Sequence, residues 1–94
     1  MKLYVVTSKD LSKSQQWVQA AHAAVQFTMD LGDKLDRHPS LVILRGDVDY
    51  YRDLFVELNI DCAWFNEPYY NNQLTAVAAL NVGELVRDLK LLRS

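Results

Sequence analysis

The stretch SKSQQWVQAAHAAVQFTMD, residues 12–30, decides how the rest of the chain is arranged. Ser12 with Gln15 three residues later matches a capping box, which starts a helix by satisfying backbone N–H groups that have no partner inside it. No residue before Asp30 breaks a helix, and Gly32 follows where helices commonly end. We therefore predict one helix of about five turns, at ~3.6 residues per turn.

This predicted helix carries one histidine among alanines. Five residues at helical spacing form one face: Trp17, Ala21, Ala24, Val25 and Thr28. The neighbouring rows hold Val18, His22, Val25 and Met29. The alanines around His22 make a smooth surface that can approach a sheet closely. A polar imidazole in that setting has two interpretations: a partly buried side chain with one hydrogen-bond partner, or a chemical group of a site.

Length and composition predict one globular domain over residues 1–94, half of them hydrophobic. A formal charge of −2 does not indicate a broad nucleic-acid-binding surface, although it leaves room for a local basic patch. The lone Cys62 excludes an internal disulfide framework and fits a reducing compartment. No segment approaches the roughly 20 apolar residues of a membrane span, and the apolar run near the N-terminus is too short for a signal peptide. We expect a cytoplasmic protein with no membrane partner.

Four short apolar segments predict strands, at residues 3–7, 41–44, 62–65 and 74–80. A second helix is predicted after a cap at Asp47 or Asp49, with a core stripe that includes Tyr51 and Phe55. A last helix is predicted from an Asn81 cap, with a stripe that continues to Leu92.

The predicted order is therefore β-α-β-α-β-β-α. Alternating strands and helices indicate an α/β fold, here a small mixed four-stranded sheet with helices on both faces. We expect the first two strands to run parallel through a right-handed crossover. The short loop at residues 66–72, with one Pro and three Asn, predicts an antiparallel pair for the last two strands.

The order of these elements, with Ser12-Lys13 and Gln19-x-x-His22-Ala23 in the first helix, resembles the type 2 peptidyl-tRNA hydrolase family. Residues 74–78 match that family more loosely. The resemblance implies a small mixed sheet between helices, the tRNA 3′ end as partner, no cofactor, and hydrolysis of the ester between peptide and tRNA to release free tRNA. Two family patterns are absent: Ser14-Gln15 stands where the family has Gly-Lys, and residues 67–72 replace an Asp-Ala-Gly-Arg-Thr loop.

Ester hydrolysis needs a positioned water, a group that takes its proton, and donors for the developing oxyanion. The chain has no Gly-x-Ser-x-Gly, so direct attack by water is the simplest mechanism. His22 is the candidate base, since an imidazole changes charge near neutral pH. The resemblance places Glu67 where the family has its acid, able to polarise His22 or orient the water, and Lys13 is the candidate for the missing family lysine.

Further residues are candidates for substrate binding. Lys9 and Lys13 precede or begin the first helix, whose N-terminus favours phosphate. Three neutral amides are suited to a carbonyl or a ribose hydroxyl: Gln19, Asn71 and Asn72. Tyr70 is suited to stacking on an unpaired base. Each has a plainer interpretation, as a surface lysine, a turn asparagine or a core aromatic residue.

Two alternatives to the hydrolase stay open. The first is a non-catalytic domain of the same fold that binds tRNA, a nucleotide or a protein partner, because the family Gly-Lys is missing. The second is a homodimer formed through an apolar face such as Tyr50, Tyr51 and Phe55. We expect no metal, since His22 and His38 lack both a ligand spacing and paired acids.

Overall fold

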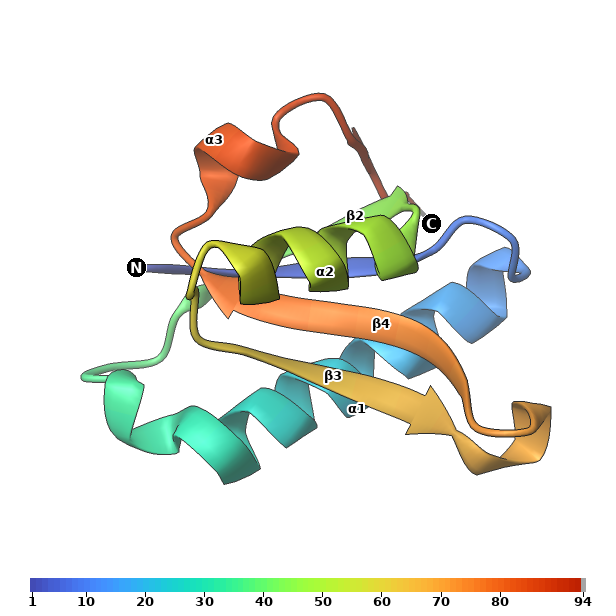
Figure 1. Cartoon of the computed structure of the whole chain (residues 1–94), viewed down its shortest axis with the longest axis horizontal. Coiled ribbons are helices and arrows are strands. Elements are labelled where there is room, and N and C mark those ends of the chain that lie inside the picture. Colours follow the sequence, from blue (N-terminus) through green and yellow to red (C-terminus); the bar gives the residue numbers. More distant parts are fainter. Residues whose placement is uncertain (94) are drawn as a thin grey trace.

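β1 (Lys2–Ser8) is the central strand of a five-stranded mixed sheet (Figure 1). It runs parallel to β2 (Ser40–Gly46) and antiparallel to β4 (Gln73–Leu80). β3 (Cys62–Glu67) pairs antiparallel with β4, and β5 (Lys90–Leu91) with β2, so the order is β3-β4-β1-β2-β5. The structure is a computed structural model that describes residues 1–93. The predicted parallel and antiparallel pairings are confirmed.

α1 (Lys13–Leu31) begins where its cap predicts. The Ser12 hydroxyl accepts a hydrogen bond from the Gln15 backbone N–H at 3.3 Å. The chain then continues into the 3-10 turn η1 (Gly32–Lys34), and Gly32 has a right-handed φ of −59°. Gly32 therefore does not end the helix through a left-handed conformation. Within residues 1–93, no helix has the length and hydropathy needed to cross a bilayer.

The side of α1 that packs on the sheet consists mainly of small and polar residues. It comprises Gln16, Gln19, Ala20, Ala23 and Phe27, all buried. The apolar row read from the sequence lies mostly in solvent, with Trp17, Val18, Val25 and Met29 exposed. The opposing surface contributes Ala76 and Ala78 on β4 and Ala63 on β3, small residues that allow the helix to approach the sheet closely at Ala20 and Ala23.

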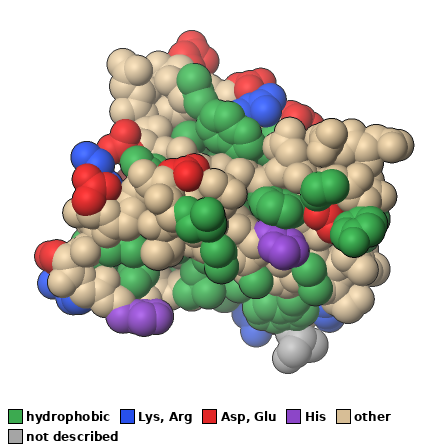
Figure 2. All heavy atoms as spheres, turned by 90° about the horizontal axis from the view of Figure 1, so that it is seen from below, with side chains coloured by type: hydrophobic (Ala, Val, Ile, Leu, Met, Phe, Trp, Pro, Cys, Tyr) green, Lys and Arg blue, Asp and Glu red, His purple; other side chains and the backbone are tan. Residues whose placement is uncertain are grey.

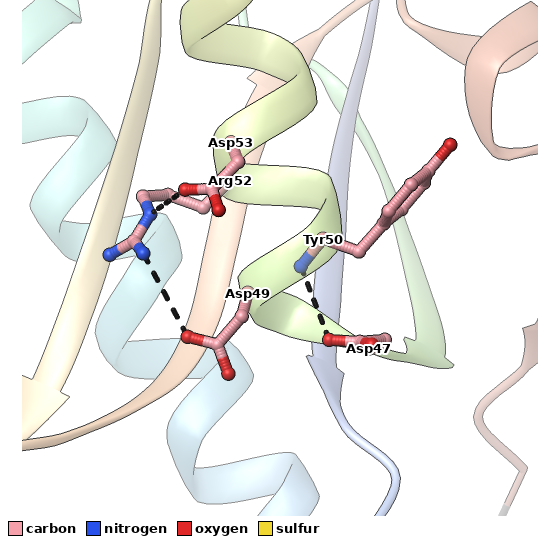
Figure 3. A network of polar contacts seen from close by, with 5 residues as sticks. All are labelled: Asp47, Asp49, Tyr50, Arg52 and Asp53. Carbon is pink, nitrogen blue, oxygen red and sulfur yellow. Dashed lines mark hydrogen bonds and ion pairs between the residues drawn. The ribbon is translucent and has the colours of Figure 1, made fainter.

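α2 (Val48–Glu57) and α3 (Gly83–Val86) belong to the opposite layer; in Figure 1, α2 crosses in front of the sheet and α3 lies at the top. Phe55 of α2 is fully buried there with Val6, Val77 and Val86. Of the two predicted caps, Asp47 is the one used: its Oδ1 accepts from the Tyr50 N–H at 3.1 Å (Figure 3).

Arg52 occupies the outer surface of α2. It forms ion pairs with Asp53 at 2.9 Å and Asp49 at 3.8 Å (Figure 3). Its guanidinium also lies 5.8 Å from the centre of the Trp64 ring. Both carboxylates are exposed, so each pair contributes at most about 1 kcal/mol to stability. These contacts neutralise Arg52 locally and tie α2 to β3.

The C-terminal part of the chain differs from the prediction. A helix continuing to Leu92 and a sheet of four strands were expected, but α3 is only four residues long and a fifth strand follows it. Asn81 is not the cap: it is left-handed at φ 54°, and its side chain accepts from the Lys2 N–H at 3.0 Å. Residues 90–92 instead satisfy the edge of β2, where the Leu92 N–H donates to the Ile43 carbonyl at 2.9 Å.

The register of α1 can be tested by unfolding. We expect Phe27→Ala to lower the free energy of unfolding by about 3–5 kcal/mol, because Phe27 is fully buried and its removal leaves a cavity. Met29→Ala is the matched control on the same helix, and its 74% exposed side chain predicts a change within about 0.5 kcal/mol. Urea titration measures both. A larger loss for Met29→Ala would show that the other row packs on the sheet.

Candidate functional site

His22 projects from the exposed side of α1 onto the edge of the sheet. Its ring stacks on that of Phe65 in β3, with centroids 4.4 Å apart and planes 14° apart. Within residues 1–93 no hydrogen bond reaches the imidazole, so both ring nitrogens are available to water or a ligand. Figure 2 shows this side of the molecule, where hydrophobic side chains gather around one of the two histidines.

Glu67 is the last residue of β3 and lies two residues after Phe65. Strand alternation puts residues 65 and 67 on the same face, about 6.6 Å apart along the strand. Glu67 is only 9% exposed, and its carboxylate has no ion pair or hydrogen bond among the residues that the structure describes. A carboxylate therefore ends the strand on which the His22 ring rests, although no direct bond joins the two side chains.

Gln19 lies beneath this surface and not on it. Its side chain is fully buried, and its Oε1 accepts a hydrogen bond from the Thr75 hydroxyl at 2.7 Å. Thr75 is the extra residue of a bulge in β4, where Phe65 pairs with Ala76 and the next residue of β3 pairs with Leu74. The prediction that the Gln19 amide faces a substrate does not match this burial. The bulge, which directs Thr75 at α1, has no local signal in the sequence.

The polar layer around Gln19 is incompletely paired. Gln19 Nε2 and Thr7 Oγ1 are both buried, and neither has a hydrogen-bond partner within residues 1–93. Gln16 differs, because its Nε2 donates to the Leu11 carbonyl at 2.8 Å. A buried amide N–H without a partner lowers the stability of the fold. Within this layer, the Gln19 side chain is held by its hydrogen bond from the Thr75 hydroxyl.

Asn71 and Asn72 form the turn between β3 and β4, after the 3-10 turn η2 (Pro68–Tyr70). Both are left-handed, at φ 53° and 59°, a conformation that asparagine tolerates better than most residues. The Asn72 N–H donates to the Glu67 carbonyl at 2.9 Å, which closes the turn. Both side chains are exposed and Tyr70 is half-buried. Conformation alone thus explains the two asparagines, and no bond links them to His22.

The two candidate lysines lie away from His22 and from each other. Lys13 begins α1, and nine residues at 1.5 Å each separate it from His22 by about 13.5 Å along the axis. It lines a pocket of about 440 Å³ with Arg45, Lys90 and Arg93. Lys9 instead borders a smaller hollow of about 260 Å³ that also contains three aspartates: Asp10, Asp47 and Asp49. The predicted site residues therefore do not come together in one site.

Arg45, Lys90 and Arg93 were not among the residues singled out from the sequence. Arg45 follows the predicted strand at 41–44, and a single cation at the end of a strand only weakly indicates a binding site. Lys90 lies within the segment predicted as a helix and Arg93 just after it. On such a helix, cations are expected on the solvent-exposed face and do not indicate a site. Only the fifth strand brings them beside Arg45.

Cys62 does not offer a nucleophile. Burial raises the pKa of its thiol, and the neighbouring Asp61 carboxylate raises that pKa further, against a smaller opposite effect of Arg52. The thiol therefore stays protonated at neutral pH, and only a thiolate attacks or binds metal. In the described part of the chain, no three side chains of His, Cys, Asp or Glu come together as metal ligands.

Comparison with known proteins identifies a fold and no activity. Neither a protein-family model nor a curated protein matches the chain. A solved structure of a protein of unknown function from Agrobacterium tumefaciens strain C58 is similar, with a TM-score of 0.70, 14% sequence identity, and coverage of 96% of each chain. At that identity the similarity shows the mixed α/β fold alone.

The Gln19–Thr75 bond can be tested by a double-mutant cycle. We expect Thr75→Val to lower the free energy of unfolding by about 1–3 kcal/mol, because the Gln19 carbonyl oxygen loses its only hydrogen-bond partner among residues 1–93. Combining it with Gln19→Met, which removes the orphaned amide, should restore part of that loss. Chemical denaturation of the two single variants and the double variant measures the coupling. Strictly additive losses would show that the bond contributes nothing.

Proposed function

We propose that the protein hydrolyses the ester between a peptide and the 3′ end of tRNA, with His22 taking the proton of the attacking water. The observation that supports this most directly is the His22 ring, which lies flat on Phe65 with neither nitrogen hydrogen-bonded among residues 1–93, beside the strand that ends in Glu67. The resemblance of residues 12–13 and 19–23 to type 2 peptidyl-tRNA hydrolases supplies the substrate class.

The proposed chemistry follows from these positions. Stacking on Phe65 limits the ring to one plane while its edge faces solvent, so a water bound at one nitrogen has a defined place. His22 accepts a proton as the water attacks the ester carbonyl, and returns it to the leaving ribose oxygen. In this proposal the Glu67 carboxylate, which ends the strand that carries Phe65, orients the attacking water.

The tRNA end also needs a surface for its unpaired bases. Tyr69 follows Glu67 by two residues and is 91% exposed, so one face of its ring is available for stacking. Stacking of a base on an aromatic side chain contributes about 1–3 kcal/mol regardless of the base. Tyr69 therefore suits the terminal nucleotide better than the half-buried Tyr70.

A second candidate is binding of the tRNA end without turnover. It is favoured by one observation: no hydrogen bond within residues 1–93 fixes the tautomer of His22, whereas catalytic histidines are commonly oriented by a third group. The distance of Lys13 from His22 along α1 also favours binding without turnover. Lys13 is the candidate to replace the lysine of the family Gly-Lys pair, and it does not lie beside the His22 ring.

Turnover separates the two candidates. With N-acetylated aminoacyl-tRNA as substrate, we expect the protein to release free tRNA, and His22→Ala to lower kcat by about 10²–10⁴, the contribution typical of a general base. His38→Ala is the matched control, because His38 is an exposed loop residue that bonds to the Pro39 carbonyl, and its activity should equal that of the unmodified protein. Full activity in His22→Ala would remove His22 from the mechanism.

Absence of release, under conditions where an established hydrolase is active, would leave the binding candidate. Titration of tRNA at several salt concentrations then tests that candidate directly. Binding that weakens steadily with salt would support it, because phosphate contacts release counterions. Absence of binding at low salt would contradict both candidates.

A further inference from the structure

Four cations converge on one pocket of an acidic protein. Lys13, Arg45, Lys90 and Arg93 line a pocket of about 440 Å³, and no acidic side chain borders it. Four other cations each lie within 4 Å of a carboxylate: Lys34, Arg37, Arg52 and Arg87. Among residues 1–93, the pocket cations have no such partner. Of the six cations outside the pocket, only Lys2 and Lys9 also lack a carboxylate partner among the described residues, so the pocket gathers most of the cations that form no ion pair there.

Two of these positions are electrostatically unfavourable in the empty protein. Arg45 on β2 stands directly opposite Lys90 on β5, and like charges at directly opposite positions destabilise a sheet. Lys13 begins the 19-residue helix α1, whose first turn contains no acidic residue, although the positive end of a helix dipole disfavours a cation there. An anion in the pocket relieves both conflicts, and the backbone N–H groups of the helix N-terminus add donors for it. Conflicts of this kind mark functional positions.

A second pocket, largely apolar, adjoins the basic one. Its volume is about 390 Å³, and it shares Leu91 and Arg93 with the basic pocket. Its wall includes Trp17, Leu41 and Ile43, and Trp17 is 38% exposed. In Figure 2, Lys and Arg side chains appear next to hydrophobic ones at the edge of this side of the molecule.

The two pockets are aligned by α1. Trp17 follows Lys13 by four residues, so both side chains leave the same side of the helix, from Cβ atoms about 5–6 Å apart. The combined site therefore offers charge at one end and an aromatic ring at the other. A ligand that fits has an anionic end and a flat apolar end.

We propose that this double pocket binds a nucleotide, with its phosphates on Lys13, Arg45, Lys90 and Arg93 and its base against Trp17. Arginine forks bind phosphate oxygens in pairs, and lysines add compact charge. An indole ring accepts any base. The phosphate and base come from a free nucleotide or from the end of a single-stranded RNA. The site stands independently of ester hydrolysis, because it includes neither His22 nor Glu67.

Calorimetric titration of the whole protein with ATP, inorganic tripolyphosphate and a short single-stranded oligouridylate tests the site. We expect ATP to bind more tightly than tripolyphosphate by about tenfold, the contribution of one stacked base. Trp17→Ala should reduce ATP affinity to that of tripolyphosphate while leaving tripolyphosphate binding unchanged. If Trp17→Ala weakened the binding of ATP and of tripolyphosphate equally, the base would not lie against Trp17.

Lys90→Gln tests the charged end. We expect it to weaken ATP and tripolyphosphate alike, by about tenfold or more, since each contact to a charged group is strong. Without ligand, its unfolding midpoint should equal or exceed that of the unmodified protein, because the repulsion from Arg45 is removed. That second measurement excludes misfolding as the cause of lost binding.

Arg87→Gln is the matched control, since Arg87 is an exposed arginine paired with Glu84 at 3.5 Å outside the pocket. It should bind all probes normally. Equal weakening in Arg87→Gln and Lys90→Gln, or no binding of any probe at low salt, would overturn the proposal. Oligouridylate that binds more tightly than ATP and is displaced by tripolyphosphate identifies an RNA end as the source, and the reverse order identifies a free nucleotide.

Discussion

The close approach of α1 to the sheet is the constraint on which the rest of the structure depends. Ala20 and Ala23 pack against Ala76 and Ala78, and with no longer side chains between them the helix backbone lies near the strands. Phe27 closes the end of this contact. Because the small residues face inward, the larger apolar residues of α1 face outward, and the protein exposes apolar surface along most of the helix.

This orientation also places the polar residues. Gln19 is directed into the core, where the bulge in β4 supplies Thr75 as its partner. His22 lies three residues further on, far enough around the helix to leave the core and rest on Phe65. The side of α1 that faces the sheet therefore sets both the buried Gln19–Thr75 bond and the exposed position of His22.

The charges follow a different logic. Most of the surface pairs cations with carboxylates, as Arg52 does with Asp49 and Asp53 (Figure 3), while the pocket at the start of α1 collects cations alone. About 13.5 Å of helix separates this pocket from His22, and the exposed Trp17 and Val18 lie between them. The two proposed sites also lie toward opposite edges of the sheet, because the pocket borders β2 and β5 whereas His22 rests on Phe65 of β3.

Much of the local structure could be read from the residues themselves. The β-branched run at the start of the chain, the caps at Ser12 and Asp47, and the Pro and Asn residues of the turn before β4 act over a few residues, so strands β1 to β4 and helices α1 and α2 were predictable in place and direction. Exposed His22 was identifiable as a candidate for the same reason, since its neighbours are alanines.

What only the tertiary structure decided depends on residues distant in the sequence. The packed side of α1 was set by the alanine floor of β3 and β4, and the burial of Gln19 by a bulge 56 residues away. The open edge of β2 drew Lys90–Leu91 into a strand in place of a helix, and this brought Lys90 opposite Arg45. Sequence by itself established the elements, because their signals are local. The folded chain decided which side chains meet, because packing and electrostatic repulsion exist only between surfaces that folding brings together.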